Sequence, residues 1–252
     1  MILELRQVEK RFGGVRAVDG VSFAMNEGEF AALIGPNGAG KSTLLALTAA
    51  ALRCDAGSIR FAGAPLGATP AQCAQLGIGR TFQSAQVFTS MTLRENVLLA
   101  LAARDRSSLA ISQPLWPDTR APGAAVASAA DELLARVGLR AHTSRAASEI
   151  AYPDAKRLEL AIALAGRPRL LLMDEPTAGM AAAERLALMD LVRALATQSR
   201  MSVLFTEHSM DAVFGYAQRV LVMARGKLIA DGAPDAVRRD AAAQSAYFGA
   251  PA

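Results

Sequence analysis

Apolar positions along the chain alternate between short continuous runs and longer stretches with helical spacing. The short runs are rich in Val, Ile and Phe, and the longer stretches are rich in Ala and Leu. Buried strands read as short apolar runs, whereas helices need ten or more residues, so this alternation predicts an α/β fold. The expected strands cover residues 3–12, 18–24, 30–34, 170–174, 201–206 and 220–223.

The expected helices cover residues 42–52, 131–137, 154–165 and 181–196, with one more between the last two strands. A further helix is predicted to begin at Thr92, because Thr92 and Glu95 have the spacing of a capping box ahead of an apolar run. Turns are expected at residues 13–14 and 225–226. Residues 104–123 contain three prolines and no steady periodicity, which favours an insert or linker between subdomains.

Composition places the chain among folded proteins with one large domain or two small ones. Of its 252 residues, 52% are hydrophobic and 20% are charged, which excludes a disordered tail and a fibrous repeat. The aromatic share of 5% and the net charge of +4 argue against a nucleic-acid partner, which would call for stacking platforms or a strongly basic surface.

The cysteines and the lengths of the apolar runs bear on the cellular setting. Cys54 and Cys73 have no histidine at ligand spacing, so no structural zinc site is expected and a reducing compartment fits. The apolar runs fall short of the ~20 residues that a spanning helix needs, and the charges among residues 1–12 favour a strand over a signal peptide. We therefore expect a soluble chain whose membrane contact comes through a partner.

A glycine-rich loop between an expected strand and an expected helix is the most informative motif. It matches G-x-x-x-x-G-K-[ST]. Glycines let backbone N–H groups curl around phosphate, and the following helix N-terminus adds partial positive charge. Lys41 is expected to reach the β- and γ-phosphates, and Ser42 to give a hydroxyl ligand to Mg²⁺. The candidate nucleotide-binding residues are Gly35, Pro36, Asn37, Gly38, Ala39, Gly40, Lys41, Ser42 and Thr43.

Two acidic residues end the strand expected at residues 170–174. Asp174 and Glu175 fall at the carboxyl end of the sheet, where ligands of α/β proteins bind. Asp174 suits the Mg²⁺ shell, and Glu175 can polarise an attacking water as a general base. Two acids after a strand are more often a solvated strand end, but beside a phosphate loop they predict a nucleoside triphosphatase.

Three further features, in a fixed order along the chain, narrow the class of nucleoside triphosphatase. Gln83 ends the sequence Gly-Arg-Thr-Phe-Gln, residues 150–161 open a helix just before the Asp-Glu strand, and His208 ends the next strand. This ordered set resembles the ATP-binding subunit of an ABC transporter, over essentially the whole chain. The resemblance implies an α/β fold of the P-loop NTPase class and ABC type, in which a mixed sheet core carries an antiparallel β subdomain and a helical subdomain.

The same resemblance implies a single ABC ATPase domain over residues 1–252. Its helical subdomain is expected at about 84–165, and a short C-terminal tail at about 233–252. Several short sequences narrow the resemblance to the ATPases of branched-chain amino acid importers. They lie at residues 80–83, 151–152, 157–159, 174–180 and 246–249.

Roles for three more residues follow from the resemblance alone. Gln83 matches the glutamine that contacts the metal and the attacking water, His208 the switch histidine at the γ-phosphate, and Phe12 the aromatic that stacks on adenine. Each also has a plainer interpretation: Phe12 as a core or strand-edge side chain, Gln83 as a surface glutamine, and His208 as a structural histidine with its hydrogen bonds satisfied. The expected catalytic residues are Lys41, Gln83, Glu175 and His208, and the expected metal ligands are Ser42, Gln83 and Asp174.

Two segments depart from the family pattern. The helix-opening signature is commonly Leu-Ser-Gly-Gly-Gln, presented across a dimer interface, but this chain has Ala151 for the serine and Pro153 for the second glycine. Because alanine lacks a hydroxyl and proline lacks an N–H, one composite site can lose about 3 kcal/mol of transition-state stabilisation. Alternatively, Pro153 merely suits a helix start. Ala181 stands where the family usually has aspartate, which puts coupling across the dimer in doubt.

The resemblance implies an ATPase that powers an ABC importer for branched-chain amino acids or related small solutes, with ATP and Mg²⁺ bound. The implied partners are transmembrane permease subunits, a second ATPase subunit (a different chain or another copy) and, indirectly, a solute-binding protein. The implied location is the cytoplasmic face of the inner or plasma membrane. Two alternatives remain: a soluble ABC-type ATPase acting on DNA or ribosomes, and a regulatory partner in an asymmetric complex that hydrolyses ATP weakly or not at all.

Overall fold

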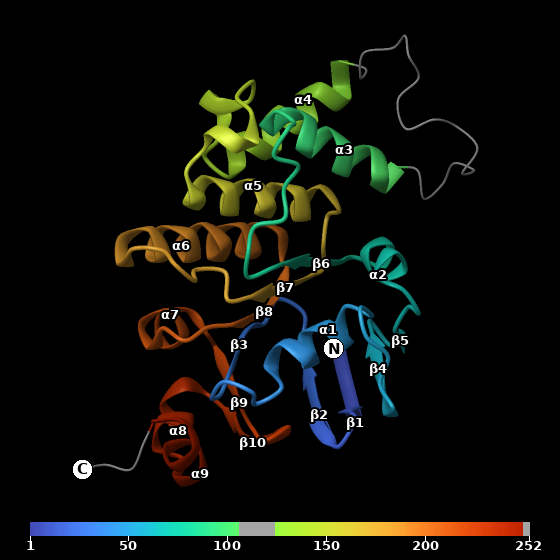
Figure 1. Cartoon of the computed structure of the whole chain (residues 1–252), viewed down its shortest axis with the longest axis vertical. Helices are drawn as coiled ribbons and strands as arrows, with labels where there is room; N and C mark the ends of the chain where they lie inside the picture. Colours follow the sequence, from blue (N-terminus) through green and yellow to red (C-terminus); the bar gives the residue numbers. More distant parts are fainter. Residues whose placement is uncertain (106–123, 249–252) are drawn as a thin grey trace. The chain divides into compact units, whose positions relative to one another are not determined.

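The computed structural model describes residues 1–105 and 124–248, which fall into two units (Figure 1). Unit 1 combines Met1–Gln83 with Arg169–Ala252, and unit 2 is Ser84–Pro168. Within the described ranges, no helix is both long and apolar enough to cross a membrane. The insert predicted at residues 104–123 lies almost wholly outside the described residues.

A six-stranded mixed sheet forms the centre of unit 1. Across the sheet its strands are β10 (Lys227–Gly232), β9 (Arg219–Ala224), β3 (Phe30–Ile34), β8 (Ser202–Thr206), β7 (Leu170–Asp174) and β6 (Ile78–Thr81). Strand β10 pairs antiparallel with β9, and the other neighbours pair in parallel. Every residue of β3, β7 and β8 is buried, as continuous apolar runs predict for strands covered on both faces.

An antiparallel sheet of four strands forms the second layer of unit 1. Its order is β2 (Val15–Met25), β1 (Leu3–Phe12), β4 (Ala56–Phe61) and β5 (Ala64–Pro65). In β1 the buried positions change from odd to even numbers, since Leu3, Leu5 and then Val8 are buried. Gln7 has a left-handed φ of 48°, and the register shifts beside it, so a bulge turns Val8 back toward the core.

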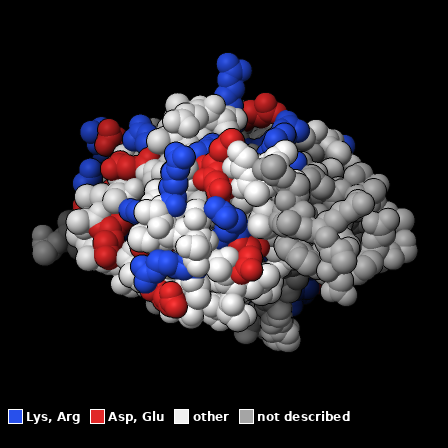
Figure 2. All heavy atoms as spheres, turned by 90° about the horizontal axis from the view of Figure 1, so that it is seen from above, with Lys and Arg blue, Asp and Glu red and all other residues white. Residues whose placement is uncertain are grey.

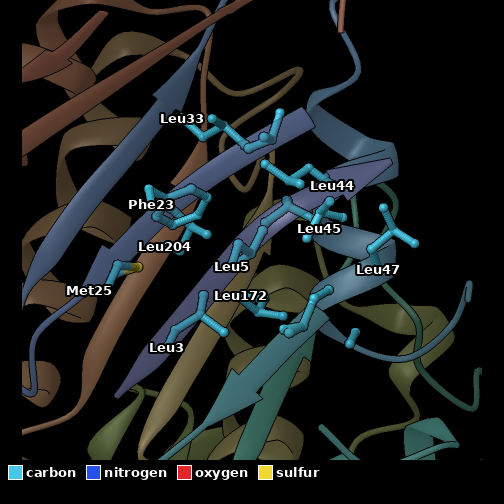
Figure 3. Packing of buried hydrophobic residues seen from close by; sticks show 14 of the residues in the cluster. Leu3, Leu5, Phe23, Met25, Leu33, Leu44, Leu45, Leu47, Leu172 and Leu204 are labelled. Carbon is cyan, nitrogen blue, oxygen red and sulfur yellow. The ribbon is translucent and has the colours of Figure 1, made fainter. Parts of the chain in front are cut away.

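One hydrophobic core joins these two sheets to helix α1 (Lys41–Thr48) (Figure 3). Helix α1 contacts both β2 and β7. The labelled core side chains come from β1 and β2 (Leu3, Leu5, Phe23, Met25), from α1 (Leu44, Leu45, Leu47) and from the mixed sheet (Leu33, Leu172, Leu204). This packing fixes the beginning of α1 against the carboxyl edge of the mixed sheet.

The other helices of unit 1 are α2 (Pro70–Leu76), α6 (Ala182–Ser199), α7 (Met210–Tyr216), α8 (Pro234–Arg239), α9 (Ala241–Ala243) and the π-helical η4 (Gln244–Phe248). Helix α1 ends four residues before the predicted position, because Ala50 takes a left-handed φ of 52°. Helix α6 runs three residues beyond the prediction and ends at left-handed Arg200. The predicted turn at residues 225–226 is confirmed, with both residues at positive φ, as a two-residue hairpin requires.

Among its described residues, unit 2 has three α-helices that contact one another: α3 (Leu93–Asp105), α4 (Ala124–Arg136) and α5 (Tyr152–Ala165). The short 3₁₀ turns η2 (Arg140–His142) and η3 (Ala147–Glu149) lie between α4 and α5. The predicted capping box at the start of α3 is confirmed. The Thr92 N–H donates to the Glu95 carboxylate at 2.7 Å, and the Glu95 N–H donates to the Thr92 hydroxyl at 3.2 Å.

Charges of both signs are interspersed over the described part of the face in Figure 2. Within unit 2, Arg94 of α3 and Asp131 of α4 form an ion pair through two bonds of 2.8 and 2.9 Å. This mixture of positive and negative side chains agrees with the small net charge of +4 that the whole chain carries.

Candidate active site

The glycine-rich loop connects β3 to α1, and its conformation requires glycine at two positions. Gly35 and Gly40 have φ values of 150° and 101°. A Cβ atom at Gly35 would lie 2.1 Å from the Met223 carbonyl oxygen, and one at Gly40 would lie 2.1 Å from the Ala17 carbonyl oxygen. Neighbouring backbone therefore packs tightly against the outside of the loop, and the loop's conformation follows from glycine alone.

Lys41 begins helix α1, and its buried side chain folds back over the loop. Its Nζ donates to the carbonyl oxygens of Gly35 at 2.7 Å and Pro36 at 3.1 Å. An ammonium group carries three N–H donors, so two are committed to the loop itself. Burial lowers the pKa of Lys41, and the negative charges of Glu175 and Asp174 partly oppose that shift.

Ser42 and Asp174 bring two side-chain oxygens together at the predicted metal position. The Ser42 hydroxyl donates to Oδ1 of Asp174 at 3.1 Å, and the Thr206 hydroxyl donates to the same oxygen at 2.8 Å. Adjacent ligands of an octahedral Mg²⁺ with bonds of about 2.0–2.1 Å lie about 2.9 Å apart. The Ser42–Asp174 separation therefore fits two neighbouring Mg²⁺ ligands.

Glu175 contacts two of the other three predicted catalytic residues, Gln83 and His208. Its Oε2 accepts a bond of 2.8 Å from Nε2 of Gln83, and its Oε1 lies 2.8 Å from Nε2 of His208. Because an ionised carboxylate only accepts, Nε2 of His208 carries the hydrogen in this contact. The structure thus brings together three residues that are 92 and 33 positions apart along the chain.

The backbone of Glu175 is in the left-handed region, with a φ of 46°. A non-glycine residue keeps this conformation only where its surroundings hold it. The Glu175 N–H donates to the Thr206 hydroxyl at 2.9 Å, and the Glu175 carbonyl accepts from the Ala178 N–H at 3.1 Å. These bonds aim the side chain toward Gln83 and His208.

Phe12 lies at the end of β1 and is 49% exposed, so it is not a core side chain, whereas its interpretation as a strand-edge side chain fits this position. The Lys10 ammonium lies 5.7 Å from the centre of its ring. An exposed aromatic face at this position is available for stacking on a nucleobase.

The structure places at or next to the site four residues to which sequence reasoning assigned no role: Thr206, Glu207, Thr177 and Arg80. Thr206 binds both Asp174 and Glu175, as described above. Buried Glu207 accepts bonds from the Thr177 N–H at 2.9 Å and the Thr177 hydroxyl at 2.6 Å. Arg80 stacks on Phe82, and its buried Nε has no hydrogen-bond partner among the described residues. Burial lowers the pKa of the Arg80 guanidinium, opposed by the Asp174 charge.

The signature segment lies in unit 2, at the beginning of α5. Ala151 is the N-cap, has extended dihedrals and makes no side-chain capping bond. Pro153 lies in the first turn, where its missing N–H has no intrahelical partner to lose. In unit 1, Ala181 is the N-cap of α6, and its N–H donates to the Glu184 carboxylate at 3.0 Å. Because alanine offers no acceptor in return, only this half of a capping box forms.

Comparisons with known proteins identify the family of the chain. Residues 18–178 match a family model described as ABC transporter, and residues 227–252 match one described as branched-chain amino acid ATP-binding cassette transporter. LivG of Salmonella typhimurium, a high-affinity branched-chain amino acid transport ATP-binding protein, is 34% identical over 249 residues, covering 98% of each chain. BraF of Pseudomonas aeruginosa, described in the same words, is 33% identical over the same share of both chains.

Solved structures give the same result for the fold. An ATP-binding cassette of an ABC transporter in its ADP conformation superposes with a TM-score of 0.84, at 30% identity and 98% coverage of both chains. A nucleotide-free ATP-binding cassette from an ABC transporter superposes with a TM-score of 0.83, at 28% identity and the same coverage. The predicted P-loop NTPase fold of ABC type is therefore confirmed.

Proposed function

The chain belongs to the ABC transporter family as an ATP-binding ATPase subunit, and from this premise we propose that it powers an importer of branched-chain amino acids. The observation that carries the proposal is the convergence of Gln83 and His208 on the two carboxylate oxygens of Glu175, each at 2.8 Å. The names of LivG and BraF support the choice of solute class, as does the match of residues 227–252.

In the proposed reaction, Glu175 acts as general base on a water that attacks the γ-phosphorus of ATP. The water gives a proton to the Glu175 carboxylate, its oxygen bonds to phosphorus, and the bond to the β-phosphate oxygen breaks to leave ADP. Gln83 and His208 contact separate oxygens of Glu175, so they can orient the base. From the family resemblance, His208 would also contact the γ-phosphate. Backbone N–H groups of the loop and the Lys41 ammonium bind the phosphates.

A divalent cation belongs to this proposal. Mg²⁺, when bound, neutralises charge on the transferred phosphate group. Ser42 and Asp174 would hold it, since their oxygens have the separation of adjacent ligands. The side-chain carbonyl of Gln83 is the chemically suitable third protein ligand.

The proposal also covers the domain organisation of the chain, its partners and its location. We assign unit 2 to a helical subdomain within a single cassette, with a short C-terminal tail after about residue 233. The proposed partners are permease subunits that cross the membrane and a second ATPase subunit, with a solute-binding protein acting indirectly. The chain would then work at the cytoplasmic face of the inner or plasma membrane, held there by the permease.

If the second ATPase subunit is a different chain, as we propose, Pro153 makes the two composite ATP sites of the pair unequal. A site that uses this chain's signature segment lacks two donors, because Ala151 has no hydroxyl group and Pro153 has no backbone N–H. A site that uses this chain's Lys41 and Glu175 keeps all of its predicted groups. Converting Pro153 to glycine restores one donor. We expect the ATPase rate of the assembled complex to rise, and an unchanged rate would remove the basis for unequal sites.

The test of the proposed function compares the wild-type chain with Glu175→Gln, both assembled with co-purified permease subunits in vesicles. Wild type should bind ATP in a calorimeter, hydrolyse it and drive leucine uptake, whereas Glu175→Gln should bind ATP but hydrolyse it at least a hundredfold more slowly. Glu27→Gln is the matched control, because Glu27 pairs with Arg169 on the surface through a bond of 2.6 Å. The proposal fails if Glu175→Gln hydrolyses ATP as fast as wild type.

A further inference from the structure

Glu207 is a buried carboxylate that the proposed reaction does not use. It follows Thr206 at the end of β8 and is only 4% exposed. Its Oε1 accepts the N–H and the hydroxyl of Thr177, at 2.9 and 2.6 Å, and its Oε2 accepts the N–H of His208 at 3.2 Å. A buried carboxylate is costly unless its oxygens are bonded, and both oxygens of Glu207 are.

Through these bonds Glu207 joins Thr177 to His208. Thr177 belongs to the loop that carries Glu175, so the bonds connect the two segments that supply Glu175 and His208 to the site. Thr177 lies two positions after Glu175, whose left-handed backbone needs support from its surroundings. Thr206 supports one end of this turn through the Glu175 N–H, at 2.9 Å. Glu207 holds the other end through Thr177. Successive residues of one strand end therefore bind successive parts of the loop that carries the general base.

We infer that Glu207 is a positioning residue that locks the Glu175 loop to the backbone of His208. With Thr177 and His208 bonded to one carboxylate, the Glu175 and His208 side chains are held at the 2.8 Å contact seen between them. This inference rests on the proposed function, since the alignment matters only if Glu175 and His208 act on ATP. It places no atom of Glu207 on the substrate.

The shortest of the three bonds can be removed with little change in shape. Thr177→Val replaces the hydroxyl by a methyl group and keeps the backbone N–H, whereas Thr177→Ser keeps the hydroxyl. Glu207→Gln keeps one acceptor oxygen but presents an NH₂ group to the N–H donors, so at least one bond is lost. Bonds to charged acceptors are among the strong ones, which makes Thr177→Val an informative change.

Tyr216→Phe serves as the matched control. The Tyr216 hydroxyl is also largely buried and donates to a carboxylate, Oδ1 of Asp190, at 2.8 Å, but it lies on α7 outside the site. A variant that merely loosens unit 1 should behave like Tyr216→Phe. A variant that misaligns Glu175 should differ from it in kcat.

The experiment measures steady-state ATP hydrolysis, calorimetric ATP binding and the melting temperature for the full chain assembled with its co-purified subunits. We expect Thr177→Val and Glu207→Gln each to lower kcat about tenfold, with KM and the ATP dissociation constant within about twofold of wild type. The double variant should be less slow than the product of the two single effects, because the bonds that the two changes remove belong to one network around residue 207. Thr177→Ser should restore kcat, and Tyr216→Phe should lower only the melting temperature.

A wild-type kcat in Thr177→Val overturns the inference and leaves the proposed function standing. So does a loss of activity that Tyr216→Phe reproduces at the same drop in melting temperature. If Glu207→Gln does not fold, the comparison of Thr177→Val with Thr177→Ser decides alone. If wild type itself hydrolyses no ATP, the proposed function fails first and this inference fails with it.

Discussion

Replacing Gly40 with alanine probes the packing that shapes the phosphate loop. Gly40 combines a φ of 101° with a neighbouring carbonyl oxygen, that of Ala17, only 2.1 Å from the position a Cβ atom would take. Alanine therefore faces two separate costs, one from its own backbone conformation and one from the clash. Gly63 offers a control for the cost of the left-handed backbone alone, because it has a φ of 81° and no atom lies within 4 Å of the position that a Cβ atom would take.

The expected sizes of the two costs differ enough to be measured. A left-handed backbone costs an alanine about 1–2 kcal/mol, which both variants incur. Relieving the Gly40 clash requires a backbone shift of about 1 Å, and overpacking of this kind costs about 1–3 kcal/mol more. The shift also displaces the N–H groups at the start of α1 that bind the phosphates in the proposed function, so we expect ATP binding to weaken at least about tenfold.

Denaturant unfolding and ATP calorimetry on both variants check this reasoning. Gly63→Ala should lower the free energy of unfolding by about 1–2 kcal/mol and leave the ATP dissociation constant at the wild-type value. Gly40→Ala should lose about 1–3 kcal/mol more than this control, together with ATP affinity. Equal losses of stability in the two variants, with ATP affinity kept in both, would refute the argument that Ala17 confines the loop.

Three other outcomes are expected. Burial lowers the pKa of Lys41 from 10.5, and phosphate binding favours the charged form of its side chain. ATP affinity measured by calorimetry should therefore fall as the pH rises through alkaline values below 10.5. In Lys41→Arg, the affinity should not change with pH over that range, because arginine stays charged. Burial and the Asp190 bond raise the pKa of Tyr216 to about 12, so its contribution to stability should be complete below about pH 10 and lost toward pH 12. Denaturant melts at each pH should show that loss in wild type and not in Tyr216→Phe. Leu204→Ala, in a fully buried central strand, should lower the free energy of unfolding by about 2–5 kcal/mol in a urea titration.

Three strands are predicted with the observed bounds, and two of them are continuous apolar runs; the third, residues 3–12, is the partly exposed β1. Residues 30–34 and 170–174 were predicted with the observed bounds, since every position in β3 and β7 is buried. Strands β4, β6 and β10 were not predicted. Each has few fully buried residues, and its place in a sheet is fixed by pairing with distant strands that the local pattern does not reveal.

Helix bounds were harder to predict where single residues decide them. Thr92 and Glu95 define the start of α3 chemically, so the sequence suffices there. The end of α1 depends on the left-handed backbone of Ala50, and alanine carries no signal for that conformation. Likewise, Arg200 ends α6 without the glycine that usually marks a helix end.

Sequence motifs reveal the residues that bind a ligand more readily than the residues that position these ligand-binding side chains. Lys41 and Ser42 are recognised because the phosphate loop needs them at fixed spacing. Thr206 and Glu207 carry no such spacing with Asp174 and Thr177, which lie about thirty positions away. A buried polar pair at the end of a predicted central strand is the one local signal that could have drawn attention to them.

The order of strands in the mixed sheet explains why residues from distant parts of the chain converge. Strands β3, β8, β7 and β6 are consecutive neighbours and parallel, so their carboxyl ends share one edge. Each is followed there by one part of the site: the phosphate loop, His208, Glu175 and Gln83. Hydrogen bonds then bring the last three residues to the 2.8 Å contacts around Glu175. A change that shifted β8 against β7 by one residue would separate His208 from Glu175 while leaving every motif in the sequence intact, because strand register, which the motifs do not encode, sets that contact.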